Sequence, residues 1–169
     1  EPRTVYLTAG KWLVKAVHGL DYKMEEVAFD TVAGEIAELT IPLIRDNPTP
    51  GWQGLEIGAR TDATSGVMTQ LDDIVLMSAA EGLDWLVSGD FERLTDPAPA
   101  IQRLGLGNYL RSSRGFRTQL PAHPEWGQFL IYPVAADAPH PAQARAEWAG
   151  LKTSKEFIAT LRRLYPGAL

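Results

Sequence analysis

The sequence predicts an α+β fold in which a partial antiparallel β-sandwich precedes a mixed α/β unit. Three observations support this prediction. Short apolar runs separated by turn residues fill residues 1–46. A stretch rich in Pro and Gly, residues 46–51, then interrupts any regular structure. Over the rest of residues 47–169, apolar strands alternate with segments of helical spacing, which is typical of parallel α/β structure.

Four antiparallel strands are expected before the interruption, over residues 5–8, 11–18, 26–32 and 36–44. Turn signals such as Ala9-Gly10 and Ala33-Gly34 separate them. Four such strands form only half a sandwich. One apolar face would stay open, so this part of the chain is expected to need a covering partner.

The second part is expected to contain both kinds of element. Residues 71–80 have the apolar spacing of a helix, with Thr69 as the expected N-cap and Gly82 as the residue that ends it. The other expected elements are strands over residues 52–59, 83–87 and 129–134 and helices over residues 98–110 and 153–165.

Composition excludes several classes of partner. The chain has 169 residues, of which 45% are hydrophobic, which is enough to bury a core. Its net charge of −5 disfavours nucleic acid, and no apolar run is long enough to span a bilayer. The absence of cysteine excludes disulfides and thiolate metal sites. The first residues lack a signal-peptide pattern, although a mature secreted chain would look the same.

Several motifs occur in an order that matches a known family. Residues 51–62, GWQGLEIGARTD, are similar to an opening of the form Gly-Trp-x-x-x-Asp-Leu-His-x-His-Thr-Asp. Residues 80–84, AEGLD, look like the entry to a second strand, and residues 127–133, GQFLIYP, resemble Gly-His-Phe-x-x-Tyr-Pro. The chain thereby resembles the polymerase-and-histidinol-phosphatase (PHP) metallohydrolases, and its first strands resemble the sandwich that precedes the barrel in secreted members of the CehA/McbA type.

The resemblance implies a secreted or periplasmic protein with a partial β-sandwich over residues 1–46 and a truncated, degenerate PHP-like α/β barrel domain over residues 47–169. In the family, histidines and a glutamate hold metal ions. The matching positions here are occupied by Gly58, Arg60, Phe91, Arg117 and Gln128. Glycine has no side-chain donor and arginine stays protonated. We therefore predict no catalytic residues, no metal and no cofactor.

The resemblance also implies a degenerate pocket, with Arg60, Asp90, Arg117 and Gln128 as candidate ligand-binding residues. We expect Asp90 to contact at least one of the two arginines. Two interpretations stay open: a cluster of ion pairs that fills an inactive site, or a site with surplus positive charge that binds a carboxylate or phosphate. The three histidines, His18, His123 and His140, have no ligand spacing, so they are expected to be structural or solvated.

The function expected from these observations is that of a non-catalytic structural or ligand-binding module derived from a PHP metallohydrolase. The alternative is a metal-dependent phosphoesterase or related hydrolase whose ligands lie elsewhere or beyond the chain. A third hypothesis is a subunit or fragment of a larger assembly, in which other protein chains or the rest of a longer precursor complete the fold. An anionic small ligand is an expected partner, whereas nucleic acid and a membrane span are not.

Overall fold

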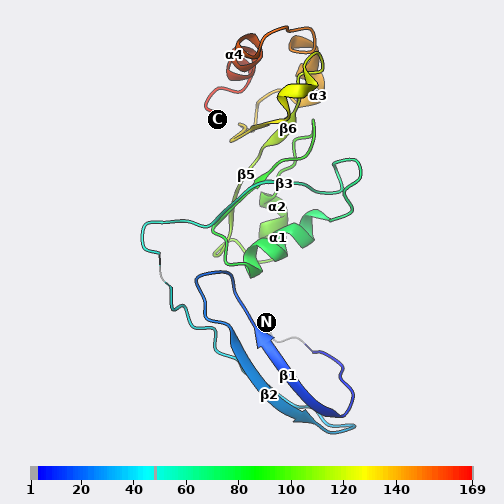
Figure 1. Ribbon diagram of the computed structural model, residues 1–169, viewed down its shortest axis with the longest axis vertical. Coiled ribbons are helices and arrows are strands. Elements are labelled where there is room, and N and C mark those ends of the chain that lie inside the picture. Colours follow the sequence, from blue (N-terminus) through cyan, green and yellow to red (C-terminus); the bar gives the residue numbers. More distant parts are fainter. Residues whose placement is uncertain (1–3, 48, 169) are drawn as a thin grey trace. The chain divides into compact units, whose positions relative to one another are not determined.

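The computed structural model describes residues 4–47 and 49–168, which divide into two compact units, Glu1–Gly51 and Trp52–Leu169 (Figure 1). The sequence placed this boundary after residue 46. Helices and small sheets are mixed along the chain, so the fold is α+β, and no closed barrel forms among the described residues. No helix within the described ranges is long and apolar enough to cross a membrane.

The first unit contains one β-hairpin. Strands β1 (Gly10–Ala16) and β2 (Glu25–Thr31) pair antiparallel, and Trp12 lies opposite Phe29. The expected strands over residues 5–8 and 36–44 do not form. Pro42 offers no N–H to a ladder, and among the described residues 36–51 strand pairing is limited to the isolated bridge Tyr22↔Arg45. The expected half-sandwich is therefore reduced to two strands in the described part of this unit.

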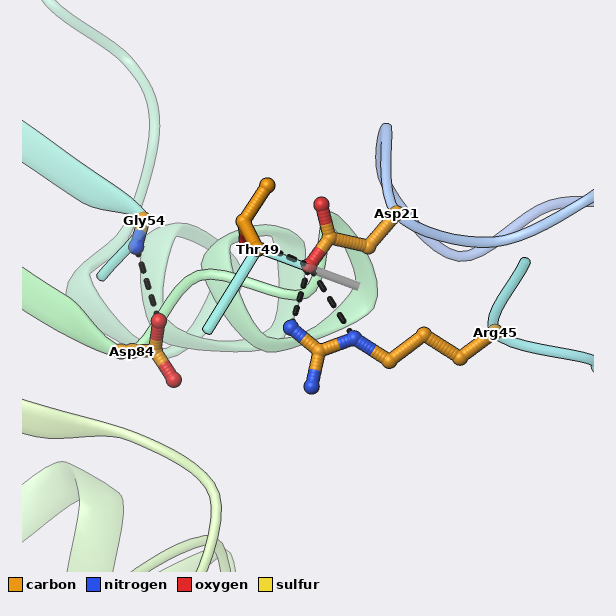
Figure 2. A network of polar contacts seen from close by, with 5 residues as sticks. All are labelled: Asp21, Arg45, Thr49, Gly54 and Asp84. Atoms are coloured by element: carbon orange, nitrogen blue, oxygen red, sulfur yellow. Dashed lines mark hydrogen bonds and ion pairs between the residues drawn. The ribbon is translucent and has the colours of Figure 1, made fainter. Parts of the chain in front are cut away.

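Asp21 fixes the end of the first unit to the turn that follows β1 (Figure 2). Its Oδ2 accepts hydrogen bonds from Arg45 Nε at 3.1 Å and from Thr49 Oγ1 at 3.4 Å. Its carbonyl also accepts bonds from the N–H groups of Asp46 and Asn47. The segment that leads to the boundary is thus held by side-chain and backbone bonds to a single residue.

The second unit begins with a three-stranded parallel sheet. Strands β3 (Leu55–Ala59), β4 (Trp85–Ser88) and β5 (Arg111–Ser113) lie in chain order. Helices α1 (Leu71–Ala80) and α2 (Ala98–Arg103) connect them, as the expected alternation of strand and helix predicts. Apolar side chains of strands and helices share one core, formed by Ala59, Val75, Leu86, Ala100, Ile101 and Leu110.

Asp84 joins the starting ends of all three strands. The N–H of Gly54 donates to Asp84 Oδ2 at 2.7 Å, and the N–H of Asp84 donates back to the Gly54 carbonyl at 2.9 Å (Figure 2). The N–H of Arg111 donates to the Asp84 carbonyl at 2.9 Å. The sheet is thereby fixed at the end opposite Asp90, which follows β4.

The rest of the unit packs around an antiparallel hairpin. Strands β6 (Phe116–Thr118) and β7 (Phe129–Ile131) flank the short 3₁₀ helix Pro124–Trp126, and helices α3 (Pro141–Ala144) and α4 (Ser154–Leu164) follow (Figure 1). A second 3₁₀ turn, Arg145–Glu147, extends α3. The core of this part comprises Phe116, Leu120, Ile131, Val134, Ala144, Trp148, Phe157, Leu161 and Tyr165.

Two element ends differ from the expectation. Helix α2 stops at Arg103 and not at residue 110, because Gly105 adopts a positive φ of 70° that ends the helix. Thr69 is not the N-cap of α1: Gln70 holds that position without a side-chain bond. Gly82 does follow α1 with φ of 69°, as expected.

Candidate functional site

Glycines allow the strand ends of the second unit to approach closely. A Cβ atom at Gly89 would lie 2.4 Å from the Gly58 Cα, and one at Gly115 would lie 2.6 Å from the Ser88 carbonyl oxygen. Strand β3 bulges between Ile57 and Ala59, where Gly58 adopts φ of 86°. Side chains at these places would separate the strands, so the polar groups nearby depend on glycine for their positions.

Asp90 follows β4 and is fully buried. Its Oδ1 accepts bonds from the Thr61 N–H at 2.7 Å and from Thr64 Oγ1 at 2.6 Å. Its Oδ2 accepts bonds from Thr61 Oγ1 at 2.8 Å and from Thr95 Oγ1 at 2.5 Å. Each carboxylate oxygen thus accepts two hydrogen bonds, which fills the acceptor sites of an ionised aspartate.

These donors decide the protonation state of Asp90. Burial by itself raises the pKa of a carboxyl group, but the hydrogen bonds from Thr64, Thr95 and Thr61 outweigh it, so the pKa of Asp90 lies below its usual value. Asp90 is therefore an ionised structural residue that joins the segments after β3 and β4.

The prediction that the Asp90 carboxylate pairs with an arginine is wrong. Among the described residues no salt bridge joins its carboxylate to Arg60 or Arg117, because the threonine donors already occupy it. The contact with Arg117 is made by the backbone: the Arg117 N–H donates to the Asp90 carbonyl at 2.9 Å. The Glu92 N–H in turn donates to the Arg117 carbonyl at 2.7 Å, which continues this pairing.

Arg117, on β6, directs its guanidinium across the glycine-lined gap to β3. Its Nη2 donates to the Gly58 carbonyl at 3.1 Å and would lie 2.5 Å from a Cβ at that residue. The guanidinium therefore occupies the space that a side chain at residue 58 would need. Its Nε is buried without a partner among the described residues. Arg117 thus carries a half-buried charge with unused donor capacity.

A cavity of about 490 Å³ opens beside this guanidinium, between β3 and α1. Arg60 and Arg117 both line it, so the structure brings together two of the predicted residues. Two acidic residues also line it, Glu56 on β3 and Glu81 at the end of α1. The apolar part of the wall is formed by Val67, Ile74, Met77 and Leu83. Charges of both signs therefore face one largely apolar space.

The other two predicted residues do not line this cavity. The carboxylate of Asp90 is buried among threonines, and Gln128 is exposed immediately before β7. Glu56 and Glu81 were not predicted. The alternation Glu56, Gly58, Arg60 along one strand was a signal for the first, since residues two apart point to the same face of a strand.

A second cavity, of about 240 Å³, lies between β7 and α4 and is mostly apolar. Leu130, Ile158 and Tyr165 are among the residues that line it. Burial and the charge of Glu147 raise the pKa of Tyr165 to about 12. The Tyr165 hydroxyl therefore stays neutral at physiological pH.

The histidines form no site with one another in the described part of the chain. His123 stacks on Trp126 with ring centroids 4.1 Å apart, and His140 Nδ1 accepts a bond from the Ala142 N–H at the start of α3. His18 contacts the Tyr22 ring edge-on. Across residues 4–47 and 49–168, no group of three or more His, Cys, Asp or Glu side chains is arranged to hold a metal ion.

Comparisons with known proteins give no match: no family model, no curated protein and no solved structure corresponds to this chain. The interpretation of the cavity therefore depends on its own residues.

Proposed function

We propose that this chain is a non-catalytic ligand-binding module that binds an anion, a carboxylate or a phosphate, between Arg60 and Arg117. The observation that carries the proposal is the Arg117 guanidinium. It is half-buried beside a cavity, and within the described residues no carboxylate pairs with it. Desolvated charge is costly unless it is compensated, so such a group favours an anionic partner.

Arg60 supplies the second charge. It follows β3 directly, is exposed, and makes no ion pair among the described residues. An exposed arginine can reorient towards a ligand, whereas Arg117 is fixed by the Gly58 carbonyl. Guanidinium groups bind carboxylate and phosphate with paired hydrogen bonds. Arg117 would thus hold the anion in a fixed orientation, and Arg60 would move towards the anion and bind it from the exposed side.

Calorimetric titration with hexanoate and with inorganic phosphate tests the proposal and separates the two anion classes. A hydrogen bond to a charged group contributes about 1.5–3 kcal/mol. We therefore expect Arg117→Gln to weaken binding roughly 10-fold to 100-fold. Arg111→Gln is the matched control, because Arg111 is exposed on β5 and does not line the cavity. Equal loss in both variants, or no binding of either anion, would contradict the proposal.

We propose further that the module derives from a PHP-type barrel preceded by a partial sandwich. The parallel order β3, α1, β4, α2, β5 and the preceding hairpin support this origin. The residues at the positions matching metal ligands support the absence of catalysis, because glycine and phenylalanine have no side-chain donor atom for a metal ion and arginine stays protonated. Stoichiometric zinc, manganese or iron in the purified protein would contradict this part of the proposal.

The same proposal extends to location and partners. A secreted or periplasmic protein of this kind would work with other protein chains, or with the rest of a longer precursor, that cover the first unit. The many exposed apolar side chains of residues 4–51 support a protein partner. Fractionation of cells that produce the natural protein tests the location, and a cytoplasmic product would contradict it.

A further inference from the structure

We infer that the cavity binds a short zwitterionic peptide of two or three residues, whose carboxylate contacts Arg60 and Arg117 and whose ammonium group contacts Glu56 and Glu81. This inference rests on the anion site proposed above and adds the class of ligand. It follows from the order of the charges along the cavity wall, from their lack of mutual pairing, and from the apolar residues that line the same cavity.

The charges are ordered along β3. Glu56 lies near the start of the strand, the Arg117 guanidinium fills the space beside Gly58, and Arg60 follows the strand's end. A strand rises about 3.3 Å per residue, so the guanidinium at Gly58 lies roughly 6.5 Å along the strand from Glu56. Arg60 lies farther along, beyond the bulge at Gly58. Negative charge therefore marks one end of the wall, and positive charge marks its middle and far end.

Helix α1 places a second carboxylate at the negative end. Ile74, Met77, Ser78 and Glu81 follow the spacing of one helical face, and all of them line the cavity. Glu81 caps the carboxyl end of α1. The backbone bonds of Asp84 and Trp85 to the Gly54 carbonyl show that the chain after α1 returns to the start of β3. The negative end of the helix dipole adds to the attraction that this end offers to a cation.

These four charged groups do not neutralise one another. Among the described residues no salt bridge includes Glu56, Arg60, Glu81 or Arg117. The two positive and two negative side chains give the wall no net charge, so a phosphate dianion would leave both carboxylates without a counter-charge. A ligand that carries one charge of each sign matches the wall better.

The separation of the charges sets the size of the ligand. In a free amino acid the ammonium and carboxylate share one carbon atom, which is too short to reach from Glu56 to the guanidinium. Since an extended chain advances about 3.3–3.6 Å per residue, two residues span roughly 7 Å, which matches that separation. Val67, Met77 and Leu83 line the same cavity and would contact apolar side chains of the peptide.

Calorimetric titration of the full chain with the dipeptide Ala-Leu and its capped forms tests the inference. Acetyl-Ala-Leu retains only the carboxylate, and Ala-Leu amide retains only the ammonium group. We expect Ala-Leu to bind at least roughly 10-fold more tightly than either capped form. We expect Glu56→Gln and Glu81→Gln to remove the preference for the free amine while acetyl-Ala-Leu still binds, and Arg117→Gln to weaken both peptides.

The outcomes separate this inference from the proposal beneath it. If acetyl-Ala-Leu or phosphate binds as tightly as Ala-Leu, and Arg117→Gln weakens that binding, the anion site stands and the peptide inference is wrong. If no probe shows binding that depends on Arg117, both are wrong. Circular dichroism of Arg117→Gln, with Arg60→Gln as a second variant at an exposed position, distinguishes lost contact from lost folding.

Discussion

Asp90 shows how this protein keeps a buried charge without a counter-ion. Its carboxylate is fully buried, yet three threonines and one backbone N–H supply a donor for each acceptor site. The threonines also act as acceptors: Thr64 Oγ1 accepts from the Phe91 N–H at 3.0 Å. The network therefore joins the loop after β3 to the segment after β4, and removing its central acceptor should release both.

Replacing Asp90 by alanine should destabilise the protein by at least about 3 kcal/mol, because several buried donors lose a charged acceptor. Urea denaturation measures the free energy of unfolding. Asp137→Ala is the control, since Asp137 is exposed in a loop and should change stability by less than about 0.5 kcal/mol. If Asp90→Ala proves as stable as this control, the assigned structural role is wrong.

Asp90 should also make stability depend on acidic pH. Its pKa is lower in the folded chain than in the unfolded chain, where it is near 3.9. The contribution of Asp90 is therefore present above about pH 4 and is lost as pH falls through the folded-state pKa. We expect Asp90→Asn to flatten this acid dependence when stability is measured by urea denaturation across that range. An unchanged slope would show that other carboxylates dominate acid unfolding.

Among the elements, α1 and α4 differ in how they begin. Thr153 and Glu156 form a capping box at α4, in which the Glu156 N–H donates to Thr153 Oγ1 at 3.2 Å. Helix α1 begins without a side-chain cap, although Thr69 stands just before it. A threonine precedes each helix, but only the Thr153 side chain, at α4, caps its helix.

This difference gives a matched pair of substitutions. Thr153→Ala should lower the free energy of unfolding by about 1 kcal/mol, because α4 loses its N-cap. Thr69→Ala should change it by less than about 0.5 kcal/mol, because the Thr69 side chain does not cap α1 and its backbone carbonyl, which accepts from the Asp62 N–H, is kept in the variant. Thermal or urea unfolding of both variants decides the matter, and an equal loss would argue against the capping box.

Sequence patterns predicted the elements whose apolar residues recur with the spacing of a helix or a strand. The apolar spacing of α1 and α4 and the runs at β3 and β4 were found near their observed places. The runs over residues 5–8 and 36–44 were misread as strands, because a strand also needs a partner, and a single sequence does not show where its partner lies. The end of α2 was also missed, because Gly105 adopts a positive φ and ends the helix before residue 110.

The candidate site was predictable only in part. Arg60 and Arg117 line one cavity, but Asp90 was assigned to them because sequence order cannot show that Thr61, Thr64 and Thr95 reach the carboxylate first. The contribution of Glu81 depends on where the end of α1 lies against β3, which is a property of tertiary packing. Charge and residue type predicted an anion site, whereas the arrangement of its residues depends on tertiary packing.

The two units of the molecule differ in how many of their residues are buried. No described residue of the range 4–51 is buried, and Tyr6, Leu20 and Ile36 are each more than nine-tenths exposed. The second unit contains both apolar cores. A hairpin with so much exposed apolar surface is marginal by itself in water.

We therefore expect the purified chain to self-associate or to bind a hydrophobic dye. Analytical ultracentrifugation at micromolar concentration should show a species larger than the monomer, and fluorescence of an anilinonaphthalene dye should rise in the absence of denaturant. A compact monomer that binds no dye would contradict this expectation and would show that the chain covers its own apolar face.

The glycine gap has a consequence for how such a sequence can change over time. A side chain at residue 58 would collide with the Arg117 guanidinium, and a side chain at residue 89 would collide with the residue 58 backbone. The clash at residue 89 is with backbone atoms, so this position should stay glycine whatever residue stands at 58. The clash at residue 58 is with the end of the Arg117 side chain, so a shorter residue at 117 would remove it, although the φ of 86° still favours glycine at 58. In a set of related sequences, a long residue at 117 should therefore occur with glycine at 58, and larger residues at 58 should occur only with a shorter residue at 117.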